Sequence, residues 1–76
     1  MNQHQLSVEA QFRPEVLERI LRVVRHRGFR IMAMTMAEGA DAEKINIEMT
    51  VASQRPVGLL SVQLAKLTDI THVQVH

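Results

Sequence analysis

The chain has 76 residues, a net charge of +1, no cysteine and only two aromatic residues. A domain of this size buries only about 60% of the surface that its unfolded chain exposes. Without cysteine it has neither disulfides nor thiolate-bound metal to stabilise it. We therefore expect one domain over residues 1–76 that gains stability from a partner. The composition argues against a membrane-spanning helix and a signal peptide, so the expected location is the cytoplasm. It also argues against nucleic-acid binding, because the chain offers almost no aromatic side chains on which bases could stack.

The first two elements are predicted to be a strand and a helix. Leu6, Val8, Ala10 and Phe12 alternate with polar residues, which is the period of a half-buried strand. Pro14 suits the first position of a helix, and Gly28 suits the residue that stops one, so a helix is expected over residues 14–27. Its apolar side chains recur at steps of three and four residues, which gives one stripe for the core.

The rest of the chain repeats this plan. Residues 30–37 and 45–51 are expected to be strands joined by an exposed hairpin connection over 37–43. A helix follows Pro56, with Val57, Leu60, Leu64 and Leu67 as its apolar stripe, and a final strand covers 71–76. The order β-α-β-β-α-β predicts an α+β, ferredoxin-like sandwich: an antiparallel four-stranded sheet with both helices on one face and the first and third strands in the centre.

The second predicted strand is apolar on both of its sides. Ile31 and Ala33 point one way, and Met32, Met34 and Met36 point the other. A bulge, or cover from neighbouring loops, would explain the pattern. A methionine row would equally make a soft, adaptable contact surface for a partner, since the predicted layout leaves one sheet face without a helix.

Five arginines lie between residues 19 and 30. Glu15 and Glu18 precede Arg19 and Arg22 by four residues, which is the spacing of ion pairs on a solvated helix face. The arginines left over are candidates for contact with an acidic partner: Arg25, Arg27 and Arg30.

Catalytic and metal-binding constellations are weak. Arg13 and Asn46 occupy the places that an acylphosphatase-like enzyme would use, but Pro14 lacks an amide and Glu15 adds a negative charge where a phosphate would bind. A metal site could use His72 and His76 with His4, yet no cysteine or carboxylate completes the set. No serine lies in a motif that would make it a nucleophile, so we assign no catalytic residues and no metal site.

Two segments carry a family resemblance. R-P-E-x-L-E-R-I-L-R-V-V-R-H-R-G-F from Arg13 to Phe29, and I-N-I-E-M-T-V-A-S-x-R-P from Ile45 to Pro56, are similar to the small regulatory subunits of acetolactate (acetohydroxyacid) synthase, in particular those of isozyme II. The resemblance implies an ACT domain that is not itself an enzyme but activates a large catalytic subunit in branched-chain amino-acid (isoleucine and valine) biosynthesis. Thiamine diphosphate, Mg²⁺ and FAD are then expected in that large subunit, with no cofactor in this chain. A homodimer through the ACT domain is left open.

The resemblance also bears on feedback inhibition. In valine-sensitive relatives the turn between the first strand and the first helix carries an asparagine and a glycine, and bare amides there hold the amino acid's carboxylate. Here Phe12 takes the place of the asparagine and Glu15 that of the glycine, while Pro14 removes an amide. The turn expected not to bind valine consists of Phe12, Arg13, Pro14, Glu15 and Val16. The alternative function is an amino-acid sensor whose ligand is not valine.

Overall fold

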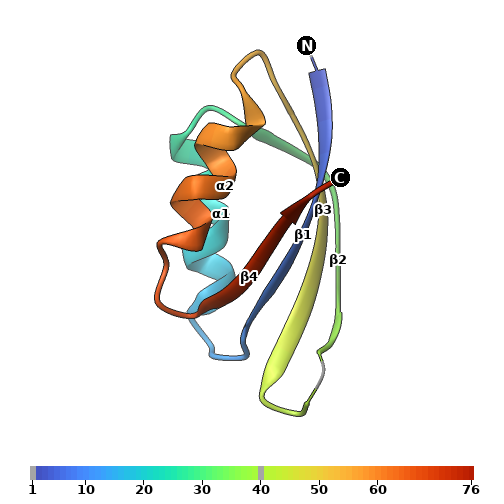
Figure 1. Ribbon diagram of the computed structural model, residues 1–76, viewed down its shortest axis with the longest axis vertical. Coiled ribbons are helices and arrows are strands. Elements are labelled where there is room, and N and C mark those ends of the chain that lie inside the picture. The colour runs from blue at the N-terminus through green and yellow to red at the C-terminus, as the bar shows by residue number, and fades with distance from the viewer. Residues whose placement is uncertain (1, 40) are drawn as a thin grey trace.

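The computed structural model describes residues 2–39 and 41–76. The elements are β1 (Asn2–Gln11), α1 (Val16–His26), β2 (Arg30–Glu38), β3 (Lys44–Ser53), α2 (Val57–Ala65) and β4 (Ile70–Val75). The strands form one antiparallel sheet in the order β2-β3-β1-β4, and both helices cover the same face of it (Figure 1). The predicted ferredoxin-like fold is therefore confirmed, with β1 and β3 in the centre.

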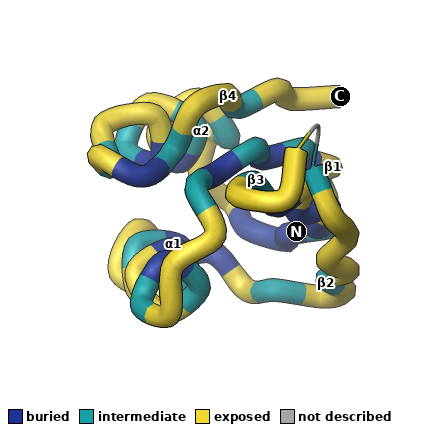
Figure 2. The backbone as a smooth tube through the Cα atoms, turned by 90° about the horizontal axis from the view of Figure 1, so that it is seen from below, coloured by how far each residue is buried: buried dark blue, intermediate teal, exposed yellow. Residues whose placement is uncertain are grey.

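Most of the buried apolar residues of the sheet lie in the two central strands, β1 and β3. Their alternating apolar residues pair across the sheet, for example Leu6 with Met49 and Val8 with Ile47, and all four side chains are buried beneath the helices. Figure 2 shows burial concentrated on these strands and on the inner sides of the helices. The period-2 pattern thus fixes which face of the sheet the helices cover.

Helix α1 packs on this face through Val16, Ile20 and Val24, which recur every four residues and are all buried. The helix begins at Val16, two residues later than predicted, because Pro14 lies in a turn in which the amide of Val16 donates to the carbonyl of Arg13 at 3.2 Å. The placement of Pro14 as the first helical residue was therefore wrong. Gly28 does stop the helix, with φ of +83°, a conformation that favours glycine.

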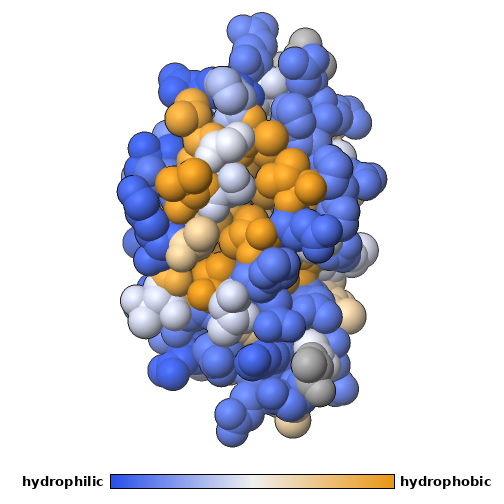
Figure 3. Space-filling model, in the orientation of Figure 1, coloured by the Kyte–Doolittle hydropathy of each residue, from blue (hydrophilic) through white to orange (hydrophobic). Residues whose placement is uncertain are grey.

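Helix α2 differs from α1 because it has no charged residue from Val57 to Ala65. Leu60 and Leu64 are fully buried, yet Leu59 and Val62 on the outer side are 51% and 54% exposed. Figure 3 shows apolar side chains gathered on the face of the molecule that presents α2 and β4. Neither described helix is long and apolar enough to cross a membrane.

The connection from β2 to β3 is a short turn, as predicted. The amide of Gly39 donates to the carbonyl of Lys44 at 2.9 Å, and the amide of Glu43 donates to the side chain of Asp41 at 2.9 Å. Such local bonds from an aspartate side chain are typical of turns. Ala40, inside the predicted connection, lies outside the described residues.

Candidate functional site

The turn between β1 and α1 contains the five residues that were expected not to bind valine, Phe12 to Val16. Phe12 is 64% exposed, Arg13 and Pro14 are exposed, Glu15 is half-buried and Val16 is buried in the core. The amide of Phe12 donates to the carbonyl of Glu43 at 2.7 Å, and the amide of Val16 is used by the bond that closes the turn. Two of the amides that could hold a carboxylate are thus engaged within the chain, and Pro14 has none to offer.

Asp69 occupies this turn from another part of the chain. It lies just before β4, and its largely buried carboxylate contacts Nε of Arg13 at 3.2 Å and Nη1 of Arg19 at 3.1 Å. Its carbonyl also accepts a hydrogen bond from the amide of Gln11 at 2.8 Å. A carboxylate of the protein itself therefore pairs with both arginines next to the turn.

The predicted ion pairs along α1 were wrong, because the structure gives Arg19 a different partner. Arg19 pairs with Asp69 and not with Glu15, and the described residues show no ion pair between Glu18 and Arg22. The only other pair in the described ranges joins Lys44 to Glu9 at 3.8 Å. Sequence reasoning missed Asp69, although the predicted topology gave a signal: antiparallel β1 and β4 bring the residue before β4 beside the end of β1.

The arginines proposed for partner contact lie at the opposite end of α1. Arg25, Arg27 and Arg30 are exposed, and none of them takes part in the ion pairs of residues 2–39 and 41–76. Arg55, which sequence reasoning did not single out, lies over Gly28, where an added Cβ would be 2.9 Å from its Nε. This end of the molecule therefore carries four arginines: Arg25, Arg27, Arg30 and Arg55.

Ser53 links the end of β3 to the end of α1 through hydrogen bonds. Its hydroxyl donates to the carbonyl of Gly28 at 2.9 Å and accepts the amide of Arg55 at 3.0 Å. The end of β3 is thereby tied to the residue that terminates α1. Because Ser53 is almost completely buried, these hydrogen bonds are shielded from water. They fix the backbone at Gly28 and Arg55, next to the basic side chains.

The methionine row is only partly present. The register between β2 and β3 shifts at Met32, which has no partner, so a bulge interrupts the strand as one of the two interpretations expected. Beyond the bulge Met34 pairs with Met49 and Met36 with Ile47, so both face the helix-bearing side with Ile31. The sequence-based placement of the methionines opposite Ile31 was therefore wrong.

Two of the methionines remain available to a partner. Met32 is 49% exposed and Met36 is 42% exposed, whereas Met34 packs against the core. Met36 also lies next to the turn between β1 and α1, because it lines a hollow of about 250 Å³ together with Phe12 and Ile45. The structure thus separates Met32, near the arginine-rich end, from Met36, near the turn.

The face of the sheet without helices is polar. Ser7 donates to Glu48 at 2.8 Å and lies within hydrogen-bonding distance of Nε2 of His76. This is not a catalytic triad, because the carboxylate bonds to the serine and not to the histidine. His72 pairs with Glu9 on this face, but His4 pairs with buried Val51 on the other.

The alternative sites therefore do not assemble. The described residues contain no group of three or more histidines and carboxylates that could hold a metal ion. For the phosphatase-like arrangement, Arg13 is paired with Asp69, and Asn46 lies opposite Glu9 in the sheet. A phosphate there would meet an additional negative charge.

Comparisons with known proteins agree with this geometry. The profile of the ACT domain family matches residues 12–73. The chain is 60% identical over 75 residues to the acetolactate synthase isozyme 2 small subunit of Escherichia coli strain K12, covering 99% of this chain and 86% of that protein.

Solved structures share the fold at much lower identity. The acetolactate synthase small subunit of Thermotoga maritima superposes with a TM-score of 0.86 at 20% identity, and the match covers 99% of this chain but only 47% of that one. The ACT domain of a GTP pyrophosphokinase from Chlorobium tepidum gives a TM-score of 0.81 at 10% identity, covering 97% of this chain and 96% of that domain.

Proposed function

Because the chain belongs to the ACT domain family and to the isozyme 2 small subunits of acetolactate synthase, we propose that it is the regulatory subunit of such an enzyme and activates its large catalytic subunit. The observation that carries this proposal is 60% identity over nearly the whole chain to a small subunit of that enzyme. The catalytic chemistry, with thiamine diphosphate, Mg²⁺ and FAD, then resides in the large subunit. The complex is expected in the cytoplasm.

Activation requires that the subunit bind the active arrangement of the catalytic subunit more tightly than the inactive one. The residues proposed for this contact lie at the arginine-rich end of α1 and along β2: Arg25, Arg27, Arg30, Met32, Met34 and Met36. Of these, Met34 contributes least because it is already packed against the core. A homodimer is the second contact proposed, since β2 and β4 are both sheet edges with unpaired backbone groups.

Valine is proposed not to act through the turn between β1 and α1. The exposed phenyl group of Phe12, the missing amide of Pro14 and the charge of Glu15 all oppose a bound carboxylate. Asp69 supports the same conclusion, because it already pairs with the two arginines nearest the turn. The proposed subunit therefore activates without feedback by valine.

Complex formation tests the proposed partner directly. The chain is mixed with the isolated large catalytic subunit of an isozyme 2 enzyme and applied to size-exclusion chromatography, with each component alone as a control. We expect a co-eluting complex at a fixed ratio of the two chains. Separate elution at every ratio would contradict the proposal.

A further inference from the structure

The outer side of α2 and the free edge of β4 form one uncharged surface, which we call the α2–β4 face. Its exposed apolar residues are Leu59, Val62 and Val75. Neither α2 nor β4 contains lysine, arginine or a carboxylate, and Figure 3 shows apolar side chains gathered over both elements. Single exposed apolar residues are ordinary on a protein surface, but a contiguous group marks a contact with another molecule.

The backbone of β4 defines the shape of an occupant. β4 pairs only with β1 and is an edge of the sheet. The amide of His76 donates to the carbonyl of Gln5 at 2.9 Å, and in an antiparallel ladder alternate residues point their backbone groups to the same side. Gln74 therefore points its backbone groups towards β1, whereas Val73 and Val75 point theirs outward. An extended segment pairs with such groups by adding a strand to the sheet.

The side chains around this edge define the chemistry of the added segment. Val73 and Val75 lie on the helix-bearing side of the sheet, since their partners in β1 are buried beneath the helices. On that side an added strand would meet the apolar flank of α2, which packs beside β4. On the other side it would meet the polar residues His72 and Gln74. The segment therefore needs aliphatic residues at every second position, and its docking would remove water from no charge of α2 or β4.

A second copy of this chain is the less favourable occupant. The antiparallel register that uses the outward groups of both Val73 and Val75 would set His72 of one copy opposite His76 of the other. Like groups at directly opposite positions repel each other once both are protonated. A different chain is free of this constraint.

We propose that the α2–β4 face receives an extended, uncharged segment of the large catalytic subunit as an additional strand beside β4. This inference rests on the proposed function and adds a contact to the residues proposed there.

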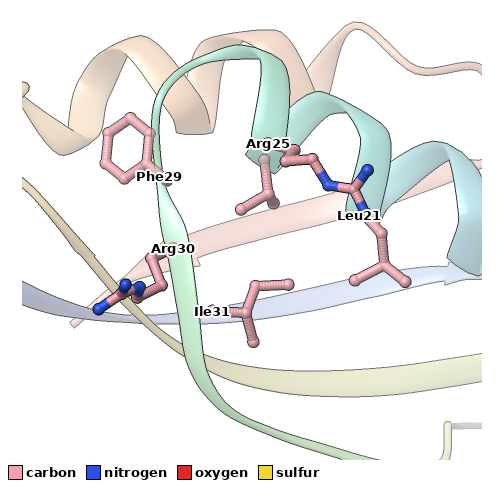
Figure 4. A pocket seen from close by; sticks show the side chains of 6 residues that line it. Leu21, Arg25, Phe29, Arg30 and Ile31 are labelled. Carbon is pink, nitrogen blue, oxygen red and sulfur yellow. The ribbon is translucent and has the colours of Figure 1, made fainter.

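The arginines proposed for partner contact lie apart from this face. Arg25 and Arg30 line a hollow of about 370 Å³ between α1 and β2, and Figure 4 shows their side chains on these two elements. The order of the strands puts β2 and β4 at opposite edges of the sheet. A contact through arginines weakens with salt, whereas a contact through the α2–β4 face does not. Salt therefore separates the two contributions.

The test measures the dissociation constant for the isolated large catalytic subunit at low and at high salt, and the amide hydrogen exchange of β4 with and without that subunit. Leu59→Ser and Val62→Ser make the exposed side of α2 polar, and Phe12→Ser makes a similar change at an exposed apolar residue outside the face. Val75→Pro removes an outward amide, which an edge strand tolerates, whereas Val75→Thr keeps that amide. Circular dichroism and thermal melting establish that each variant is folded; if Val75→Pro is not, the hydrogen exchange of the wild-type chain decides.

We expect Leu59→Ser, Val62→Ser and Val75→Pro each to raise the dissociation constant about tenfold, by the same factor at low and at high salt. Phe12→Ser and Val75→Thr should change it by less than about threefold. The amides of Val73 and Val75 should exchange more slowly in the complex, because the added strand accepts or covers them.

Unchanged exchange of these two amides would overturn the strand pairing, and an equal loss of affinity in Phe12→Ser would overturn the assignment to the α2–β4 face. If the chain alone formed an oligomer in sedimentation that Leu59→Ser and Val75→Pro dissociate, a second copy would be the occupant and the inference would be wrong. A wild-type chain that does not bind the large subunit at all would contradict the proposed function itself. Binding that is unchanged in every variant would overturn only this inference.

Discussion

At the scale of single residues, two glycines illustrate how backbone conformation decides the effect of a side chain. Gly28 has φ of +83°, and an added Cβ would lie 2.9 Å from the Nε atom of Arg55. Because Arg55 is a flexible, exposed side chain that can move, the main cost of a substitution comes from the left-handed backbone. Gly58, in the first turn of α2, has no atom within 4 Å of its added Cβ.

We therefore expect opposite signs for the same substitution at the two positions. Gly28→Ala should lower the free energy of unfolding by about 1–2 kcal/mol because of its positive φ. Gly58→Ala should raise it by up to about 1 kcal/mol, because alanine is the better helix former and restricts the unfolded chain. Urea unfolding of both variants measures this difference. A stable Gly28→Ala would contradict the left-handed conformation at that residue.

At the scale of elements, Asp69 joins segments that are distant in the sequence. Its side chain connects the residue before β4 to the turn after β1 and to the second turn of α1. Asp69 is 6% exposed, but both arginines are at least half exposed, so water and salt weaken each ion pair. The contribution to stability is therefore smaller than that of a fully buried ion pair.

Asp69→Ala is expected to lower the free energy of unfolding by about 1–2 kcal/mol, since it leaves two neighbouring arginines without a shared carboxylate. Asp69→Asn, which keeps the shape, should lose most of the same amount if the charge is responsible. Glu18→Gln serves as the control, because Glu18 is exposed and lies in the same region. Urea unfolding of the three variants tests this, and no loss in either Asp69 variant would show that the contact is not stabilising.

The elements also differ in how well the sequence predicts them. The strict alternation in β1 and β3 comes from burial on one face only. The sequence therefore predicted both strands, their central position and the burial of Leu6, Ile47 and Met49. In β2 the residues are apolar on both sides, so the pattern could not locate the bulge at Met32 or show that Met34 turns towards the helices.

The remaining errors have a common physical origin in contacts between segments. The start of α1 depends on the bonds of the turn before it, and Pro14 is compatible with either the turn or the first helical position. The choice of Asp69 over Glu15 as the partner of Arg19 depends on how the loop before β4 packs. Spacing along one helix therefore predicted the exposed arginines but not the ion pair that one of them makes.

At the scale of the whole molecule, the fold places two different surfaces at the two ends of α1. One end carries the turn from Phe12 to Val16, beside which Asp69 pairs with Arg13 and Arg19, and the other end carries Arg25, Arg27 and Arg30. The long axis separates Arg25, Arg27 and Arg30 from the turn, whereas Met36 lies next to it. The proposed function thus combines activation of a large subunit with insensitivity to valine in a single small domain.

The most direct measurement is the rate of acetolactate formation by the isolated large catalytic subunit as this chain is titrated in, with and without valine. We expect a saturable rise in rate that is the same with and without valine. No rise would contradict the activating role, and a rise that valine reverses would contradict the conclusion that Phe12, Pro14 and Glu15 prevent effector binding.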